Sequence, residues 1–329
     1  MRTVLAVDGG NSKTDLALLT EEGELLGLAR GPLSSPHHLG LNGSMDVLEA
    51  LLAEAGGADR AQADVAVLYM AGLDFADEEA ALRAEVESRD WAREVHVGND
   101  TFAVLRAGTE RGWGVAVVCG AGINCVGVSP DGRHVRFPSL GEISGDWGGG
   151  LDVGLAAIAA AARSEDGRGP RTSLERLVPA YFGLETPTEL ARALHTGDVP
   201  QRDAIGLAPL VLTTAADDAV AAEIVDRLAD EVVAFARAAL VRLDLTQEAV
   251  HVVLGGGLLR SGDRRLLRGI EKGLREVGPQ LIVGPAESAP IAGSALVGLD
   301  ELGAGAEAQA RARRELGAAL ALQHSLKES

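Results

Sequence analysis

The stretch VLAVDGGNSKTDLALL, residues 4–19, decides the fold of the amino-terminal part of the chain. An apolar strand over residues 2–8 enters the loop 9–13, and the apolar segment 14–20 predicts a second strand rather than a helix. The turn EEGE then leads to a third strand over residues 24–30. A Walker loop or a dinucleotide-binding turn requires a helix after its glycine-rich loop. The sequence therefore favours a phosphate-binding loop of the hairpin kind, in which backbone N–H groups surround an anion.

The same pattern occurs a second time in the chain. The segment GWGVAVVCGAGINCVGVSPDGRHVRF, residues 112–137, again predicts strand, glycine-rich loop, strand, Asp-Gly turn and strand. Between the two meanders, strands over residues 64–72 and 94–100 alternate with helices over residues 44–55 and 77–89. A duplicated meander of this kind predicts two domains of similar fold.

We therefore expect an α/β protein with a two-domain organisation. The first domain is expected over residues 1–112 and the second over residues 113–302, with a helical insert at about 151–245. The tail, residues 303–329, is predicted as a charged, alanine-rich and exposed helix that packs back onto the first domain. Because no low-complexity linker separates the domains, their junction is expected to act as a hinge.

Composition narrows the class of protein. Hydrophobic residues make up 47% of the chain and charged residues 24%, as in a folded soluble protein. No apolar run has the roughly 18 residues of a membrane span, and no signal peptide is recognisable, so we expect a cytoplasmic protein. The net charge of −18 argues against nucleic-acid or anionic-membrane partners. Cys119 and Cys125 are expected to be inert small hydrophobes rather than a disulfide.

The two glycine-rich loops offer the chemistry that a polyphosphate needs. The first, DGGNSKT, supplies backbone N–H groups, two hydroxyls and Lys13, and the second, CGAGIN, supplies N–H groups and the amide of Asn124. One such loop alone is an ordinary turn, whereas a matched pair, one in each domain, favours the binding of the ATP phosphates by both loops. Asp8 ends the first strand, where its carboxylate is able to hold Mg²⁺ through water.

Asp100, in the segment HVGNDT, has two readings. It ends a strand and precedes a helix, which is a typical place for a helix N-cap. A carboxylate in the same place is also suited to orient an alcohol and accept its proton during phosphoryl transfer. The sequence leaves both alternatives open.

Five motifs in a fixed order carry a resemblance to a known family. VDGGNSKT, GND, CGAGIN, GDWGGG and LGGGLL resemble the sugar kinase and actin-type ATPase superfamily. More closely, they are similar to the family that joins N-acetylglucosamine kinases to the ATPases of benzoyl-CoA reductase and 2-hydroxyacyl-CoA dehydratase systems. The resemblance covers residues 1 to about 303, and SEDGRGPRTSL resembles the kinase branch in particular. It implies two ribonuclease-H-like (actin-like ATPase) domains around an interdomain cleft, ATP and Mg²⁺ as cofactors, and a homodimer.

The resemblance also assigns roles residue by residue. Asp100 matches the catalytic base, and Asp8 matches a residue near the metal. The two phosphate motifs match Gly9, Gly10, Asn11, Ser12, Lys13 and Thr14, and then Gly120, Ala121, Gly122 and Asn124. The adenosine motif matches Gly255, Gly256, Gly257 and Leu258.

The acceptor pocket is expected to depart from the family pattern. Its matching positions are Ser35, Ala71, Gly72, Asn99, Asp100, Leu140, Glu142 and Asp146. Ser35 stands where family members often have Asn, and Leu140 stands where the N-acetylglucosamine kinases have Trp. Glu142 either pairs with the free amine of an unacetylated amino sugar or is a solvated loop residue.

The resemblance thus implies an ATP-dependent kinase for an amino sugar or hexose. The best matches are N-acetylglucosamine and glucosamine, phosphorylated at the 6-hydroxyl with Asp100 as base. An alternative is an ATPase that activates a CoA-ester dehydratase or reductase through a bridging iron–sulfur cluster, which needs cysteines exposed at a subunit interface. A further alternative is a sugar-sensing regulator, which would have lost the base or the phosphate loops.

Overall fold

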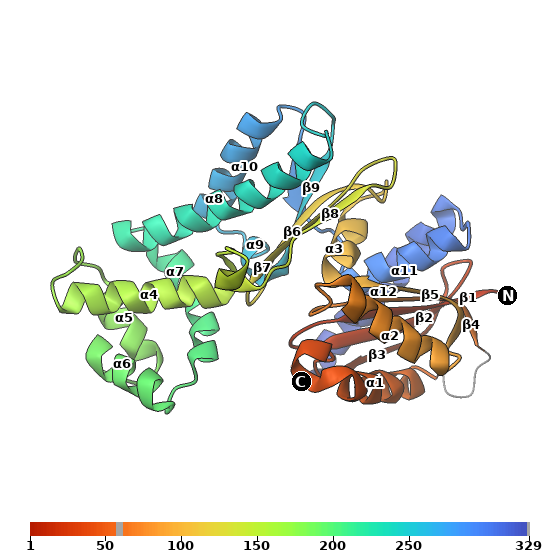
Figure 1. Ribbon diagram of the computed structural model, residues 1–329, viewed down its shortest axis with the longest axis horizontal. Helices are drawn as coiled ribbons and strands as arrows, with labels where there is room; N and C mark the ends of the chain where they lie inside the picture. Colours follow the sequence, from red (N-terminus) through yellow and green to blue (C-terminus); the bar gives the residue numbers. More distant parts are fainter. Residues whose placement is uncertain (57–61, 328–329) are drawn as a thin grey trace. The chain divides into compact units, whose positions relative to one another are not determined.

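The computed structural model describes residues 1–56 and 62–327, and Figure 1 shows how their helices and strands are arranged. The chain divides into two compact units. The first consists of Met1–Ala116, Pro130–Gly132 and Ala286–Ser329, and the second of Val117–Ser129 and Arg133–Pro285.

The first unit is built on a five-stranded mixed sheet with the order β3-β2-β1-β4-β5. Its strands are β1 (Thr3–Gly9), β2 (Thr14–Thr20), β3 (Leu25–Gly31), β4 (Ala63–Met70) and β5 (Ala92–Asn99). Strands β1, β2 and β3 pair antiparallel, as the hairpin pattern predicts, whereas β4 and β5 run parallel to β1. The segment after the first glycine-rich loop is therefore a strand, which confirms that the loop is a hairpin.

Helices cover both faces of this sheet. They are α1 (Pro36–Glu54), α2 (Ala76–Ser88), α3 (Asp100–Gly108), α11 (Pro290–Glu301) and α12 (Ala306–Lys327). The period of two along β1 sends Leu5 and Val7 into a core with α1 and α2, and Val4 and Ala6 into a core with α11 and α12. Helix α1 begins eight residues before the predicted start and is kinked at Gly40, where φ is 68°.

The second unit repeats the strand order of the first. Its sheet consists of β6 (Gly114–Cys119), whose first three residues fall within the first unit, and of β7 (Ile123–Val128), β8 (His134–Arg136), β9 (His251–Gly255) and β10 (Ile282–Pro285). Their order, β10-β9-β6-β7-β8, is that of the first sheet with each strand replaced by the strand five places later in the chain. The duplication expected from the two meanders is thereby present in the topology.

Helices occupy most of the chain between β8 and β9, the region in which the sequence predicts a helical insert; in Figure 1 they are the green elements. The second unit contains η1 (Gly141–Ile143), α4 (Gly149–Glu165), α5 (Leu174–Tyr181), α6 (Pro187–Thr196), η2 (Gln201–Leu207), α7 (Ala208–Thr214), α8 (Ala219–Arg242), α9 (Gly256–Leu259) and α10 (Arg264–Val277). Asp218 begins the long helix α8 by accepting hydrogen bonds from the backbone N–H groups of Val220 and Ala221.

The carboxyl-terminal helices differ from the expected boundary at residue 302. Helix α11 belongs to the first unit, because Ile291 and Leu296 are fully buried against the face of β1 that α1 and α2 leave uncovered. The tail helix α12 is not simply exposed, since Leu316 is fully buried in the same core. Glu315 of α12 also accepts a hydrogen bond of 2.7 Å from the backbone N–H of Leu25, the first residue of β3.

Over the described residues, no single helix is both long enough and apolar enough to cross a membrane. Gln201–Thr214 and Ala219–Arg242 meet such a test only together, as a pair bent by 110°.

A close approach between α11 and α3 gives a stability prediction. A Cβ added at Gly293 would lie 1.8 Å from the backbone oxygen of Ala103, so Gly293→Ala forces the two helices apart. We expect a loss of roughly 3 kcal/mol and a fall in Tm of roughly 6–10 °C, measured by calorimetry. The matched control is Gly317→Ala in α12, where an added Cβ meets nothing within 4 Å and helix propensity predicts a gain of about 0.5–1 kcal/mol. Equal Tm values for the two variants would contradict this packing account.

Candidate active site

Strand register brings the predicted acidic residues of the first unit to one edge of its sheet. Gly9 is opposite Met70, and Met70 is opposite Asn99, so the parallel strands β1, β4 and β5 end side by side. The loop after β4 is held there by a 2.7 Å hydrogen bond from the N–H of Ala71 to the oxygen of Gly9. Asp8 and Asp100 therefore lie at the carboxyl edge of the parallel strands, the usual location of ligand sites in such sheets.

A row of charged side chains crosses the antiparallel strands at the same level. Asp8 is opposite Asp15 on β2, and Asp15 is opposite Arg30 on β3. The Asp15 side chain is fully buried, and its two oxygens accept hydrogen bonds of 2.5 and 2.9 Å from the Arg30 guanidinium. Lys13 completes the row by donating to Asp15 across 2.8 Å. The arginine and lysine hydrogen bonds hold the pKa of Asp15 below its usual value despite its burial.

The other two carboxylates have the opposite shift. Burial, with smaller contributions from Asp100 and Asp15, raises the pKa of Asp8 to about 7. Burial, with a smaller contribution from Asp74, raises the pKa of Asp100 to about 6. Three acidic groups thus share this edge with two cations, Lys13 and Arg30, which leaves negative charge uncompensated. An excess of hard carboxylate oxygen at a partly exposed edge fits the donor preference of Mg²⁺.

The N-cap of α3 is Asn99 rather than Asp100. The Asn99 amide oxygen accepts 3.0 and 2.7 Å hydrogen bonds from the backbone N–H and the hydroxyl of Thr101. Its amide nitrogen donates to Asp74 across 3.1 Å. Asp100 is therefore the first residue of the helix. Its carboxylate accepts hydrogen bonds from the backbone N–H groups of Thr101 and Asp100, and these hydrogen bonds lower its pKa less than burial raises it.

Two buried serines lie next to the glycine-rich hairpin. Thr14 donates a 2.7 Å hydrogen bond to the hydroxyl of Ser34. The hydroxyl of Ser35 is buried and has no hydrogen-bond partner within the part of the chain that the structure describes. A Cβ at Gly72 would lie 2.6 Å from this hydroxyl, so the loops after β3 and β4 are in contact. The candidate acceptor residues Ser35, Ala71, Gly72 and Asn99 are thereby gathered beside Asp100 and Asp8.

In the second unit, the predicted second phosphate loop is a tight turn. The N–H of Gly120 donates to the oxygen of Gly122 across 2.9 Å. The start of α4 packs on this turn, with hydrogen bonds from Gly150 to Gly120 (2.8 Å) and from Leu151 to Ala121 (2.9 Å). Gly149 has φ of 78°, and a Cβ there would lie 2.4 Å from the Gly122 carbonyl carbon. Gly149 of the GDWGGG motif is therefore required by the approach of α4 to the loop.

The predicted adenosine motif meets the same turn. Gly256 has φ of 83°, and a Cβ there would lie 2.1 Å from the backbone oxygen of Cys119. Gly257 is exposed, and a Cβ there would meet nothing within 4 Å. Three glycine segments thus converge at the end of β6 and leave exposed backbone beside it. The amide oxygen of Asn124 accepts a 2.7 Å hydrogen bond from the N–H of Cys125.

Of the remaining candidate acceptor residues, Glu142 lies in the short η1 segment, Leu140 precedes it and Asp146 follows it. The backbone N–H of Asp146 donates to the oxygen of Gly141 across 2.9 Å, and the hydroxyl of Ser144 donates to the Asp146 carboxylate. Leu140 is half-buried, whereas Glu142 is exposed, as expected of a solvated loop residue. The η1 segment therefore holds Asp146 through local hydrogen bonds.

The two cysteines are buried, Cys119 fully and Cys125 almost fully. Burial raises the pKa of Cys119 to about 12 and also raises that of Cys125. Their thiols therefore stay protonated and inaccessible, which is unlike the exposed thiolates that bind an iron–sulfur cluster.

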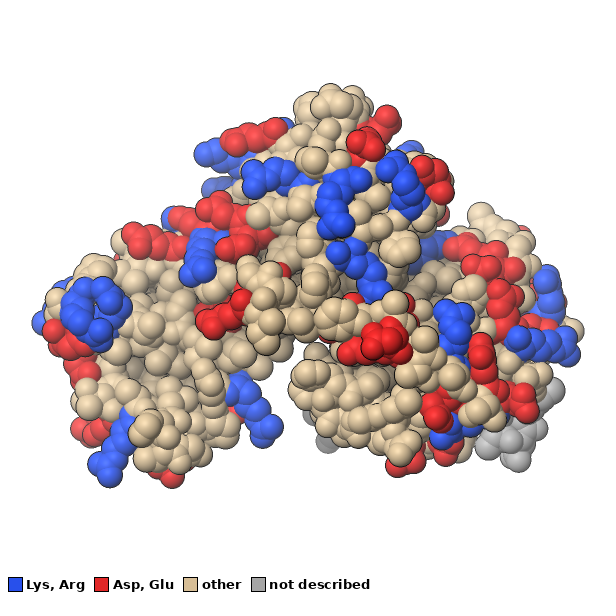
Figure 2. Space-filling view, viewed as in Figure 1, with Lys and Arg blue, Asp and Glu red and all other residues tan. Residues whose placement is uncertain are grey.

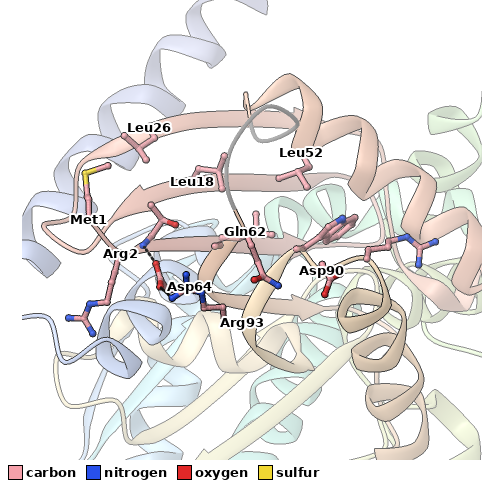
Figure 3. A pocket seen from close by; sticks show the side chains of 14 residues that line it. Met1, Arg2, Leu18, Leu26, Leu52, Gln62, Asp64, Asp90 and Arg93 are labelled. Carbon is pink, nitrogen blue, oxygen red and sulfur yellow. Dashed lines mark hydrogen bonds and ion pairs between the residues drawn. The ribbon is translucent and has the colours of Figure 1, made fainter.

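A cavity of about 700 Å³ lies at the other edge of the first sheet. Figure 3 shows its lining, which includes Leu18, Leu52, Asp64 and Arg93. Asp64 accepts hydrogen bonds from the backbone N–H of Thr3 (2.9 Å) and from Arg93 (3.2 Å). Thr3, Asp64 and Arg93 lie at or next to the starts of β1, β4 and β5, whereas Asp8 and Asp100 lie at the opposite ends of β1 and β5. The cavity is therefore separate from the candidate site.

Two further charged features lie outside the candidate site. Glu94, His96 and Glu301 place potential metal-ligand atoms within 4.8 Å of one another, a grouping that their sequence spacing does not predict. On the face that Figure 2 shows, acidic and basic side chains are interspersed.

Sequence reasoning missed Asp15, Arg30 and Ser34. The signal was present for the first two, because a charged residue at a buried position of a period-two strand requires a partner on the neighbouring strand. The sequence also did not show that the Trp147 ring packs against the Arg227 guanidinium of α8, 3.9 Å from the ring centroid.

Two units of one strand order, with a hairpin loop in each and carboxylates at the end of the first sheet, define a protein of the sugar kinase and actin-like ATPase class. The chain belongs to the BadF/BadG/BcrA/BcrD ATPase family, whose model matches residues 5–298. The predicted family and fold are thereby confirmed.

The similar proteins include named kinases. The chain is 27% identical over 271 residues to the N-acetylmuramic acid/N-acetylglucosamine kinase of Clostridium acetobutylicum, covering 79% of this chain and 87% of that protein. It is 24% identical over 198 residues to the N-acetyl-D-glucosamine kinase of Dictyostelium discoideum, covering 56% of this chain and 62% of that protein. A solved structure from Chromobacterium violaceum, provisionally assigned as an N-acetylglucosamine kinase, has a TM-score of 0.70 at 26% identity and covers 91% and 99% of the two chains.

The raised pKa of Asp8 gives a pH-dependent stability prediction. In the folded protein this carboxyl has a pKa of about 7 against an ordinary value of 3.8, so the folded state binds a proton more tightly than the unfolded chain. The cost of the buried charge is complete at pH 8, falls as the pH drops through 7, and is gone below about 4.

Asp8→Asn should therefore raise the stability of the ligand-free protein at pH 8, by on the order of 1–3 kcal/mol. The gain should shrink steadily at lower pH and vanish near pH 4, as followed by thermal unfolding in metal-free buffer. A difference in Tm that does not change between pH 8 and pH 5 would show that the Asp8 charge carries no such cost.

Proposed function

We propose that this protein is an ATP-dependent kinase that phosphorylates the 6-hydroxyl of an amino sugar, with N-acetylglucosamine and glucosamine as the best candidates. The observation that carries the proposal is the position of Asp100. It lies at the first turn of α3, with a pKa raised to about 6, beside the buried Ser35 and the exposed hairpin loop. The names of the relatives give the acceptor class.

The first unit would supply the acceptor side of the reaction. The Asp100 carboxylate would accept the proton of the attacking hydroxyl and orient its oxygen toward the γ-phosphorus. Because the pKa of Asp100 is about 6, the group is ionised at neutral pH and still basic enough to receive a proton. The unpartnered hydroxyl of Ser35 would gain a hydrogen-bond partner from the sugar.

The phosphates of ATP would be bound by backbone N–H groups and Lys13. The hairpin residues Asn11, Ser12 and Lys13 are exposed and carry the donors that a phosphate needs. In the second unit, Gly120, Ala121 and Gly122 form the matching exposed turn, and Gly257 would border the adenosine.

Asp8 would hold Mg²⁺, either directly or through a water molecule. The bound metal would neutralise charge on the phosphates during transfer. Arg30 and Lys13 neutralise Asp15 by hydrogen bonding to it. The Asp8 carboxylate would therefore be available to bind the cation.

Removing the Asp100 carboxylate tests the proposed base. We expect Asp100→Asn to lower kcat for sugar phosphorylation by at least a thousandfold, because the amide cannot accept the proton. ATP affinity should stay within about twofold of the unsubstituted protein, as measured by calorimetric titration in the presence of Mg²⁺. Asp77→Asn, at an exposed position in α2, serves as the matched control and should leave turnover unchanged. Normal turnover by the Asp100 variant would contradict the assignment.

Crowding the exposed glycine of the adenosine motif tests the nucleotide side. Gly257→Val adds a side chain where the structure has open space, so Tm should change by less than about 2 °C. If the nucleoside lies against this residue, the KM for ATP should rise at least tenfold, whereas the KM for the sugar should not change. Gly305→Val, also in open space, should leave both KM values unchanged. An unaltered KM for ATP in the Gly257 variant would remove the motif from the nucleotide site.

A further inference from the structure

The last turn of α3 is held by an arginine from the tail helix. Nη1 of Arg313 in α12 donates to the oxygen of Ala107 (2.6 Å) and to the hydroxyl of Ser288 (3.1 Å). Nη2 donates to the oxygens of Arg106 (3.2 Å) and Thr109 (3.1 Å). The final carbonyls of a helix have no partners within the helix and carry its negative dipole end. One guanidinium therefore both satisfies these oxygens and opposes their partial charge.

A second arginine ties the same turn to α11 and α12. The side chain of Arg106 in α3 is only 5% exposed and donates to Asp300 of α11 across 2.7 and 3.1 Å. It also donates to Gln309 of α12 across 3.0 Å, and Gln309 in turn donates to Asp300 across 2.8 Å. The carboxyl end of α3 is thus fixed to both helices by charge-assisted hydrogen bonds.

The other end of α3 carries Asp100. The helix has nine residues, Asp100 is the first of them, and Asn99 caps it. Nine residues span only about 13 Å, and a helix this short is not stable without tertiary contacts. The middle of α3 also packs on α11, where Gly293 approaches the backbone oxygen of Ala103, so the contacts along the helix and those at its carboxyl end together fix its position. Because so short a helix is held by its hydrogen-bonded backbone, we expect a displacement of its last turn to displace the Asp100 carboxylate as well.

We propose that Arg313 is a positioning residue for catalysis, which acts by fixing the last turn of α3 and so the place of Asp100. The proposal rests on the proposed function, in which Asp100 is the base. Arg313 lies outside residues 5–298, the part of the chain that the family model matches. The positioning contact therefore comes from a helix beyond the matched part of the chain.

Other contacts keep α12 in place when Arg313 is altered. Ala312 and Leu316 are fully buried in the core. Glu315 accepts the hydrogen bond from Leu25, and Arg311 forms ion pairs with Glu24 and Glu315. Substitution of Arg313 therefore removes its hydrogen bonds to α3 without removing these contacts.

The test compares Arg313→Ala with Arg314→Ala, at the exposed neighbouring position, well below the Tm of each variant. For Arg313→Ala we expect kcat for the sugar to fall at least tenfold, while the KM for ATP and the slow hydrolysis of ATP without sugar stay within twofold. Hydrogen exchange of the α3 amides should accelerate. Arg314→Ala should match the unsubstituted protein in every measurement.

Arg313→Lys keeps the charge but cannot span the carbonyls, so its kcat should lie between those of Arg313→Ala and the unsubstituted protein. If Arg313→Ala fails to fold, Arg313→Lys replaces it in the comparison.

Three outcomes would overturn either the positioning role of Arg313 or the proposed function. A kcat for Arg313→Ala, or for Arg313→Lys if only that variant folds, equal to that of Arg314→Ala overturns the proposal. A parallel loss of sugar phosphorylation and sugar-independent hydrolysis also overturns it, because Arg313 then contributes only to the folded fraction. Asp100→Asn is measured in the same series. If that variant turns over normally, the proposed function fails, whatever the Arg313 variants show.

Discussion

The structure of the first unit depends on keeping three carboxylates close together at one edge of a sheet. Strand register alone places Asp8 opposite Asp15, and the buried Asp15 is stable only because Arg30 and Lys13 bind it. Burial is the main cause of the raised pKa values of Asp8 and Asp100, and for Asp8 the charges of Lys13 and Arg30 offset it only in part. This edge of the sheet thus carries uncompensated negative charge, which a divalent cation is suited to neutralise.

The two glycine-rich hairpins occupy equivalent places in the duplicated topology but have different surroundings. In the first unit the hairpin carries side-chain donors, and its neighbours are the charged row and the loops after β3 and β4. In the second unit, α4 and the Gly255–Gly257 segment approach the backbone of the corresponding turn so closely that Gly149 and Gly256 have no room for a Cβ. The first hairpin therefore lies among charged side chains, whereas the second exposes backbone.

Much of this arrangement could be predicted from the sequence, for identifiable reasons. The apolar segments on either side of the first glycine-rich loop and the repetition of that loop are local patterns, so they predicted the meanders and the duplication. The family followed from the resemblance of five ordered motifs. The sequence could not decide whether Asp100 caps α3 or acts as a base, and it gave no sign that Asn99 is the cap, which only the hydrogen bond from Thr101 shows. Helix α11 was assigned to the wrong unit, since sequence position does not show which sheet face lacks a cover. The contact of Arg313 with α3 spans about two hundred residues and has no local signal.

The central claim is that these units transfer a phosphoryl group from ATP to a sugar. It is tested most directly by incubating the protein with Mg²⁺·ATP and N-acetylglucosamine, glucosamine, glucose, N-acetylmannosamine or N-acetylmuramic acid, one at a time, and analysing the products by mass spectrometry and ³¹P NMR. The account predicts that N-acetylglucosamine or glucosamine gives a 6-phosphate in equal amount to the ADP released. Release of ADP at the same rate with every sugar and with none, and no sugar phosphate, would contradict it.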